Sequence, residues 1–197
     1  MLREKLKNYH IILASGSPRR QAFFKNLGLD VEIRLKPIRE DYPEHLTYFE
    51  ISNYLAKLKA TPFKSELNPN DLLITSDTIV WHQESALGKP RDKKEAYTIL
   101  RSLSNATHEV VTSVCFTTVN VQKLLYDITR VTFKPLSDEE IEYYINQCSP
   151  FDKAGAYGIQ EWIGQIGVTK LEGSYFNVMG LPTHLVYKTL NDIAEAT

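Results

Sequence analysis

The stretch Ile11-Ile12-Leu13-Ala14-Ser15-Gly16-Ser17-Pro18-Arg19-Arg20 joins a short apolar run to small turn-forming residues and then to the start of a helix. The apolar run predicts a buried strand. Ser17 followed by proline predicts a helix capped by Ser17, with Pro18 in its first turn and Gly28 at its end. A strand that turns directly into a helix indicates a protein that mixes the two kinds of element.

The rest of the chain continues this mixture. Apolar spacing of three and four residues predicts helices at 47–61, at 92–103 and from 137 behind capping-box patterns, and at 182–193. Apolar and β-branched runs predict strands at 31–35 and 72–81, and a hairpin made of 109–121 and 124–135. Several glycines predict a loop-rich segment at 152–173. We therefore predict a single α/β domain over residues 1–197, with a mixed sheet, an antiparallel hairpin and flanking helices.

Composition narrows the class of protein. The 197 residues, 43% hydrophobic and 24% charged, suffice for one domain with a core or for two small lobes. The net charge of -1 argues against a partner that is a long nucleic acid, whereas a small anion needs only a local cluster of cations. No apolar run reaches about 18 residues, and the charged N-terminus lacks a signal peptide, so we expect no membrane contact and a cytoplasmic location. Cys115 and Cys148 lack the spacing of a zinc site.

The corner from Ser15 to Arg20 is a candidate anion site. Free N–H groups and the helix dipole attract negative charge to a helix start. Arg19 and Arg20 add forked donors that suit a phosphate. A capped helix with two solvated arginines is the alternative, although helix starts normally favour acidic side chains.

Asp77 lies inside the apolar run 72–81. An aspartate in a central strand is disfavoured by propensity and by desolvation, so its carboxylate needs a partner such as a metal ion or a water to be activated. An aspartate hydrogen-bonded at a strand end is the alternative. Glu40 and Asp41 form an acidic loop. If this loop lay near Asp77, it would add oxygen ligands for a hard cation. The alternative is a loop that is simply solvated.

Two lysines are candidates for phosphate contact. Lys89 lies between a glycine and a proline, in a turn that can point it at a phosphate or can be only a turn. Lys59 lies near the end of the predicted helix 47–61, at the edge of its apolar face. There, a lysine that extends its ammonium group into solvent is the alternative.

The segment from Asp152 to Gln160 places small residues around Tyr157. Such a segment can close over a ligand, or it can be a glycine-rich connection. Gln160 carries both a donor and an acceptor with which to recognise the edge of a base. Together the candidates supply cations for a polyphosphate, carboxylates for a divalent metal and an amide for a base, which matches phosphoryl chemistry.

In the order and spacing of its motifs, the chain resembles the Maf family over about residues 11–190. The resemblance implies an elongated α/β fold with a long twisted sheet, a cleft between two lobes and a frequent homodimer. It also implies nucleotide pyrophosphatase activity with Mg²⁺ or Mn²⁺, removal of non-standard nucleotides and, for some members, arrest of septum formation. The motifs are Leu13 through Arg20, Ser76-Asp77-Thr78-Ile79-Val80, Gly88-Lys89-Pro90, Leu103-Ser104 with His108, Asp152 through Gln160, Glu172-Gly173-Ser174-Tyr175 and Val178-Met179-Gly180-Leu181-Pro182.

The resemblance further implies roles for individual residues. Asp77 matches the general base, and Glu40 with Asp77 is expected to hold the metal. The positions tied to substrate choice are Arg19, Thr78 and Gln160. The remaining matches to positions in the cleft are Ser15, Arg20, Glu40, Lys59, Lys89 and Asp152.

The Arg19-Arg20 and Ile159-Gln160 pairs resemble the subgroup that prefers dTTP and UTP, because the 7-methyl-GTP subgroup usually has tryptophan in place of Arg19 and lacks the glutamine. Two positions depart from the pattern. Arg39-Glu40 stands where the family commonly has Asp-Glu, and Glu161 stands where a glycine often follows the glutamine, which adds a carboxylate near the base.

The predicted function is a hydrolase acting on acid anhydrides, which cuts dTTP and UTP to the monophosphate and pyrophosphate. In this mechanism, the turn at Ser15 with Arg20, Lys59 and Lys89 neutralises the triphosphate, and Asp77 takes a proton from the water that attacks the α-phosphorus. The alternatives are a 7-methyl-GTP or inosine-type triphosphate pyrophosphatase and a non-catalytic regulator of septum formation.

Overall fold

The computed structural model describes residues 1–195 of the chain. The helices are α1 (Leu2–Lys5), α2 (Pro18–Asn26), α3 (Phe49–Ala60), α4 (Lys93–Leu103), α5 (Asp138–Cys148), α6 (Trp162–Gly167), α7 (Tyr175–Val178) and α8 (Thr183–Glu195), with 3₁₀ turns η1 (Thr61–Glu66) and η2 (Ala154–Ala156). The strands are β1 (His10–Leu13), β2 (Glu32–Ile33), β3 (Asp71–His82), β4 (Ser85–Leu87), β5 (Thr107–Thr117), β6 (Gln122–Phe133) and β7 (Val168–Glu172).

The strands form a mixed sheet in the order β2-β1-β3-β5-β6-β7, with β4 paired to β3. β1 runs parallel to β2 and β3, whereas β4 is antiparallel to β3 and β7 is antiparallel to β6. The predicted mixed α/β class is therefore confirmed. The predicted hairpin corresponds to the neighbouring strands β5 and β6, whose link closes where Thr118 N donates to Val121 O at 2.9 Å.

The chain divides into two compact units, each assembled from segments that are far apart in the sequence. The first unit contains Met1–Asp77, Thr112–Asp127 and the segment from Gly180. The second contains Thr78–Val111 and Ile128–Met179. The boundary between the two units on β3 therefore falls directly after Asp77.

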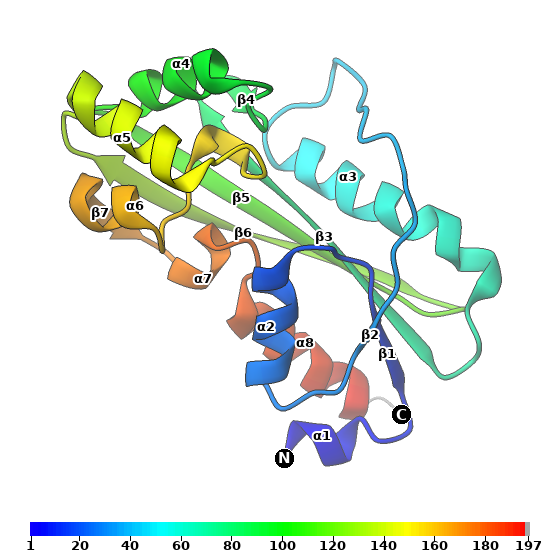
Figure 1. Ribbon diagram of the computed structural model, residues 1–197. Coiled ribbons are helices and arrows are strands. Elements are labelled where there is room, and N and C mark those ends of the chain that lie inside the picture. Colours follow the sequence, from blue (N-terminus) through cyan, green and yellow to red (C-terminus); the bar gives the residue numbers. More distant parts are fainter. Residues whose placement is uncertain (196–197) are drawn as a thin grey trace. The chain divides into compact units, whose positions relative to one another are not determined.

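In the first unit, β1 and β3 bury a small apolar cluster of Ile12, Leu73, Ala60 and Phe63. The last two residues come from α3 and η1, so this cluster fixes the end of α3 against the sheet. Figure 1 shows α1 beside α8, and Lys5 Nζ joins the two helices by donating to Glu195 Oε1 at 2.7 Å.

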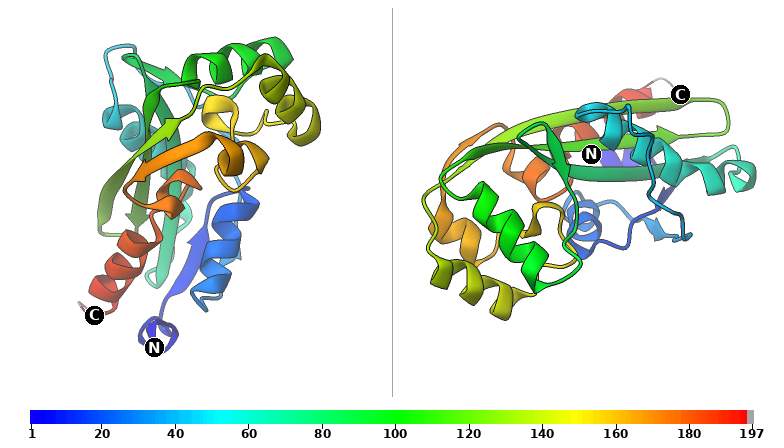
Figure 2. Two further views of the ribbon diagram at one scale, coloured as in Figure 1. Left: turned by 90° about the vertical axis from the view of Figure 1, so that its left-hand side faces the viewer. Right: turned by 90° about the horizontal axis from the view of Figure 1, so that it is seen from above.

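In the second unit, α4 and α5 lie side by side, as both views of Figure 2 show. Their buried apolar faces contribute to a large core that also contains residues of β3, β5, β6 and the segment that ends in α6. The largest fully buried side chain of α5 is Tyr144. Because a tyrosine hydroxyl needs a partner in such a place, this residue is a first sign of a polar network in the second unit.

Most predicted elements are confirmed, and the helices α2 and α5 begin at the capping residues that the sequence predicts. Ser17 Oγ accepts from Arg20 N at the start of α2, which has Pro18 in its first turn. Ser137 and Glu140 form the predicted capping box of α5. Asp92 caps α4, but the predicted box is incomplete because the Glu95 carboxylate accepts from Arg91 instead.

The segment 152–173 was wrongly predicted to be loop-rich, because it includes α6 and β7. Its glycines mark close packing. A Cβ at Gly164 would clash with the Ile159 carbonyl oxygen, and one at Gly167 would lie 2.8 Å from the Phe133 ring. The predicted strand 31–35 shortens to two exposed residues, Glu32 and Ile33. No predicted element corresponds to α1, β4, α7 or η1. Across residues 1–195, none of the helices has the length and apolar character needed to cross a bilayer.

Candidate active site

Asp77 is a buried carboxylate near the middle of β3. It is 6% exposed, and the preceding residues Leu72 through Ser76 are at most 1% exposed. Burial raises the pKa of Asp77 above its ordinary value, although Lys59 and Arg20 oppose this shift. A carboxylate in this environment is a better proton acceptor near neutral pH than one in water, provided that it stays ionised.

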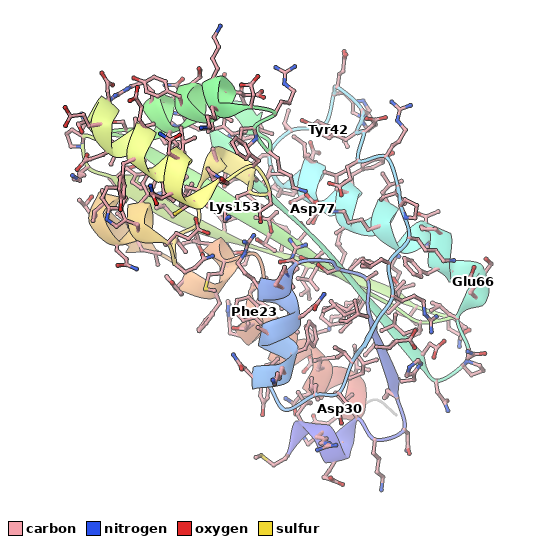
Figure 3. All side chains as sticks on the ribbon, viewed as in Figure 1. Phe23, Asp30, Tyr42, Glu66, Asp77 and Lys153 are labelled. Carbon is pink, nitrogen blue, oxygen red and sulfur yellow. The ribbon has the colours of Figure 1, made fainter. Side chains whose placement is uncertain are left out.

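Lys59, from the last turn of α3, is the direct partner of Asp77. Its Nζ donates to Asp77 Oδ1 at 2.7 Å, and its side chain is only 17% exposed. Thr75 Oγ1 donates to Ala56 O at 2.6 Å, which fixes α3 against β3 next to the pair. The alternative of a lysine that extends into solvent is therefore wrong. Figure 3 shows Asp77 beside α3.

Glu40 lies at the same ammonium group, with its Oε1 3.2 Å from Lys59 Nζ. The neighbouring residues turn the other way, because Arg39 and Asp41 form an exposed ion pair at 2.9 Å. The acidic loop therefore contributes one carboxylate to this cluster, and Arg39 pairs with Asp41 and not with Glu40.

Arg20 links α2 to the strand that carries Asp77. Its Nε donates to Gly180 O at 2.8 Å, and its Nη1 donates to Ser76 O at 3.1 Å. Burial lowers the pKa of Arg20, an effect that Asp77 opposes and Arg19 reinforces. Arg20 therefore binds the backbone directly before Asp77, a structural role that its prediction as a phosphate ligand did not include.

Ser15 closes the turn between β1 and α2. It is 6% exposed, its Oγ accepts from Ser17 N at 3.3 Å, and its carbonyl accepts from Gln21 Nε2 at 3.0 Å. Arg19 is half-buried in the first turn of α2. The first unit thus brings Ser15, Arg20, Glu40, Lys59 and Asp77 into one connected region through the contacts described.

The other predicted site residues belong to the second unit. Thr78 and Gln160 are half-buried, and Lys89 is exposed on its turn. Gly155 N donates to Gly88 O at 3.1 Å, so this turn is tied to the segment that leads to Gln160. Asp152 accepts a hydrogen bond from Lys153 Nζ at 2.7 Å.

Sequence reasoning missed a polar network next to Gln160. The hydroxyl of Tyr144 donates to Glu161 Oε2, and Lys153 Nζ lies 3.0 Å from Glu161 Oε1. Tyr144 and Lys153 are both buried. A tyrosine on the apolar face of a predicted helix was the available signal, because its hydroxyl requires a partner once it is buried.

The carboxylates around Asp77 are the candidate ligands for a divalent cation. Within residues 1–195, no group of three or more His, Cys, Asp or Glu side chains is arranged to hold a metal ion. Two carboxylates, Asp77 and Glu40, nevertheless share one positive group, the Lys59 ammonium. Mg²⁺ commonly takes one or two carboxylates and fills its shell with water and substrate phosphates, so the residues fit a metal that arrives with a nucleotide.

Comparisons with known proteins agree with the motifs. The family model described as "Maf-like protein" matches residues 10–193. A Flavobacterium johnsoniae protein named "dTTP/UTP pyrophosphatase" is 62% identical over 98% of this chain and 100% of its own length. A Christiangramia forsetii protein with the same name is 57% identical over 100% of both chains. The Staphylococcus aureus Ham1 protein shares the fold, with a TM-score of 0.51 at 14% identity over 93% of this chain and 98% of its own. This chain belongs to the Maf family.

Proposed function

We propose that this protein is a nucleoside triphosphate pyrophosphatase that hydrolyses dTTP and UTP to the monophosphate and pyrophosphate. The observation that carries the proposal is the buried Asp77 carboxylate, held at 2.7 Å by Lys59 with Arg20 and Glu40 around it. Proteins that are 57% and 62% identical over nearly the whole chain bear the name of this activity.

Asp77 is the general base of the proposed reaction. It accepts a proton from a water whose oxygen attacks the α-phosphorus, the bond between the α-phosphorus and the bridging oxygen breaks, and pyrophosphate leaves. The raised pKa of Asp77 makes it a stronger base than an exposed aspartate. A positioned base of this kind contributes about 10²- to 10⁴-fold, so neutralisation of the phosphates must supply much of the remaining rate.

The cations that neutralise the triphosphate are Lys59 and Lys89, with Arg20 beside the base. Lys59 contacts both carboxylates, so its ammonium group lies beside the proposed base and is available to a phosphate bound there. The turn at Ser15 contributes backbone N–H groups at the start of α2.

A divalent cation, Mg²⁺ or Mn²⁺, is the proposed cofactor, and Glu40 and Asp77 would hold it. When bound, it would neutralise charge on the phosphates and on the departing pyrophosphate. Because only two carboxylates are available, we expect its affinity to be low without a nucleotide and higher with one.

Substrate choice is assigned to Arg19, Thr78 and Gln160. Uracil and thymine share the same edge of acceptor, donor and acceptor groups, and cytosine does not. The Gln160 amide offers one donor and one acceptor, so it can pair with two neighbouring groups of that edge. It discriminates against cytosine when its oxygen and nitrogen are held in one orientation, because N4 and N3 of cytosine require the opposite orientation. The family resemblance also supports a homodimer, and the nucleotide substrates support a cytoplasmic location.

The test is pyrophosphate release from dTTP, UTP, CTP, 7-methyl-GTP, ITP, GTP and ATP, each with Mg²⁺ or Mn²⁺ and with a chelator as control. Release mainly from dTTP and UTP, abolished by the chelator, is the expected result. Release mainly from 7-methyl-GTP or ITP would contradict the assignment of the base pocket. Absence of release from every nucleotide in folded protein would overturn the enzymatic proposal in favour of a non-catalytic role in septum formation.

A further inference from the structure

Glu161 lies at a point where its side chain and its backbone are both fixed. The side chain accepts from the Tyr144 hydroxyl and pairs with Lys153 at 3.0 Å. The backbone carbonyl accepts from Gly164 N at 3.0 Å, at the start of α6. In Figure 3, Lys153 lies next to α5, the helix that carries Tyr144.

The same network fixes Gly158, two residues before Gln160. Gly158 N donates to the Tyr144 oxygen at 3.0 Å, and Glu161 N donates to Gly158 O at 3.0 Å. A Cβ at Gly158 would lie 2.8 Å from the carboxyl carbon of Glu161, so the carboxylate packs directly on the glycine backbone. Residues 158–161 therefore form a closed turn around Tyr144.

Gln160 is half-buried between two neighbours that are held by packing and hydrogen bonds. On one side, Ile159 is buried, and its carbonyl lies so close to Gly164 that no side chain fits there. On the other side is Glu161. A backbone that is fixed on both sides limits the positions that the Gln160 side chain can reach, which favours precise recognition.

The Glu161 carboxylate has a cation as a partner within the network. Lys153 is 8% exposed and pairs with both Glu161 and Asp152. The extra carboxylate thus binds a tyrosine and a buried lysine, whose ammonium group it shares with Asp152. This arrangement accounts for an acidic residue in a place where the family often has glycine.

We propose that Glu161 is a positioning residue, which through Tyr144 and Lys153 holds the turn that presents Gln160 to the base and thereby determines base selectivity. The inference rests on the proposed function, because it requires Gln160 to contact the base. Glu161 itself does not touch the nucleotide in this account.

The experiment compares Glu161→Gln and Tyr144→Phe with wild-type protein. The matched control is Glu140→Gln, because Glu140 also pairs with a lysine of the second unit, Lys134 at 2.6 Å, but belongs to the cap of α5. For each protein, kcat and KM are measured with dTTP, UTP and CTP, and circular dichroism and melting establish that it is folded.

We expect KM for dTTP and UTP to rise by about tenfold to a hundredfold in both network variants, with a smaller change in kcat, because displacement of a binding group by about 1 Å has an effect of this order. Selectivity for dTTP over CTP should fall by a similar factor. The Glu140→Gln protein should match wild type in KM and selectivity.

A second comparison separates positioning from general stability. In a Gln160→Ala background, Glu161→Gln should cause no further loss of selectivity, whereas a merely structural effect would add to that of Gln160→Ala. Unchanged selectivity in folded Glu161→Gln protein, or full additivity, would overturn the inference and leave the proposed function standing. Inactive wild-type protein would overturn both.

Discussion

Replacement of Lys59 by methionine should destabilise the protein in a pH-dependent way. Asp77 is 6% exposed, and Lys59 Nζ lies 2.7 Å from its Oδ1. At an effective dielectric constant of about 20, that distance corresponds to an attraction of roughly 6 kcal/mol. Desolvation of the two charges offsets part of it, and removal of one partner from a buried pair typically costs about 3–5 kcal/mol. We expect a loss of about 3 kcal/mol at pH 8, because Lys59 keeps 17% exposure.

The sign of the pH dependence follows from Asp77. Burial already raises its pKa, and Lys59 acts to lower it, so the variant should have a still higher Asp77 pKa. A carboxyl group with a raised folded pKa favours the folded state at low pH, and this contribution is lost as pH rises through that pKa. The stability difference between wild type and Lys59→Met should therefore shrink as the pH is lowered from 8 to 5.

The assay is urea unfolding at several pH values, with Lys57→Met as the matched control because Lys57 is an exposed lysine of the same helix. Asp77→Asn in the Lys59→Met background should recover much of the lost stability at pH 8, since the amide is neutral. The reasoning is refuted if Lys59→Met lies within 1 kcal/mol of the Lys57→Met control at pH 8, or if the deficit does not change with pH.

Three further outcomes are expected. Gly155→Ala should lower the free energy of unfolding by about 1–3 kcal/mol, because Gly155 has φ +70° and a Cβ there would lie 2.7 Å from Val80. A stability equal to that of wild type in denaturant melts would refute this prediction. Arg20→Lys should cost about 1–3 kcal/mol, since the single nitrogen of lysine cannot occupy the positions of both Nε and Nη1, from which the guanidinium donates to two separate carbonyls. The same melts check it. Burial lowers the pKa of His108 to about 3, from an ordinary value of 6.5. Because the pKa of His108 is lowered in the folded state, the unfolded chain gains a proton first as pH falls. Between pH 7 and pH 5, the free energy of unfolding of wild type should therefore fall by about 2 kcal/mol more than that of His108→Gln. An equal fall in the two proteins would contradict the lowered pKa of His108.

The main elements could be predicted because their signals are local. Apolar periodicity located β1, β3 and α3 to within a few residues, and Ser17 and Ser137 cap the helices that they were predicted to cap. Segment 162–172 escaped prediction because its glycines were interpreted as signs of loops. Instead, Gly164 packs on the Ile159 backbone, and Gly167 packs on Phe133, which lies far away in the sequence.

The contacts of the site could not be derived from spacing alone. Asp77 was recognisable as a charge in an apolar strand, but its partner Lys59 lies 18 residues away on a helix, where its position at the edge of the apolar face favoured a solvated lysine. Arg20 was predicted from its charge, and its two backbone partners were not. Glu161 was noticed only as a departure, since its partner Tyr144 lies 17 residues earlier in the chain.

The most direct test of the proposed reaction is hydrolysis of UTP in ¹⁸O-labelled water by wild-type and Asp77→Asn proteins. The account predicts UMP and pyrophosphate as the products of the wild type, with the label in the phosphate of UMP because water attacks the α-phosphorus. It also predicts that Asp77→Asn remains folded and loses about 10²-fold or more of the turnover. Label in pyrophosphate, or near-normal turnover by folded Asp77→Asn protein, would contradict the account.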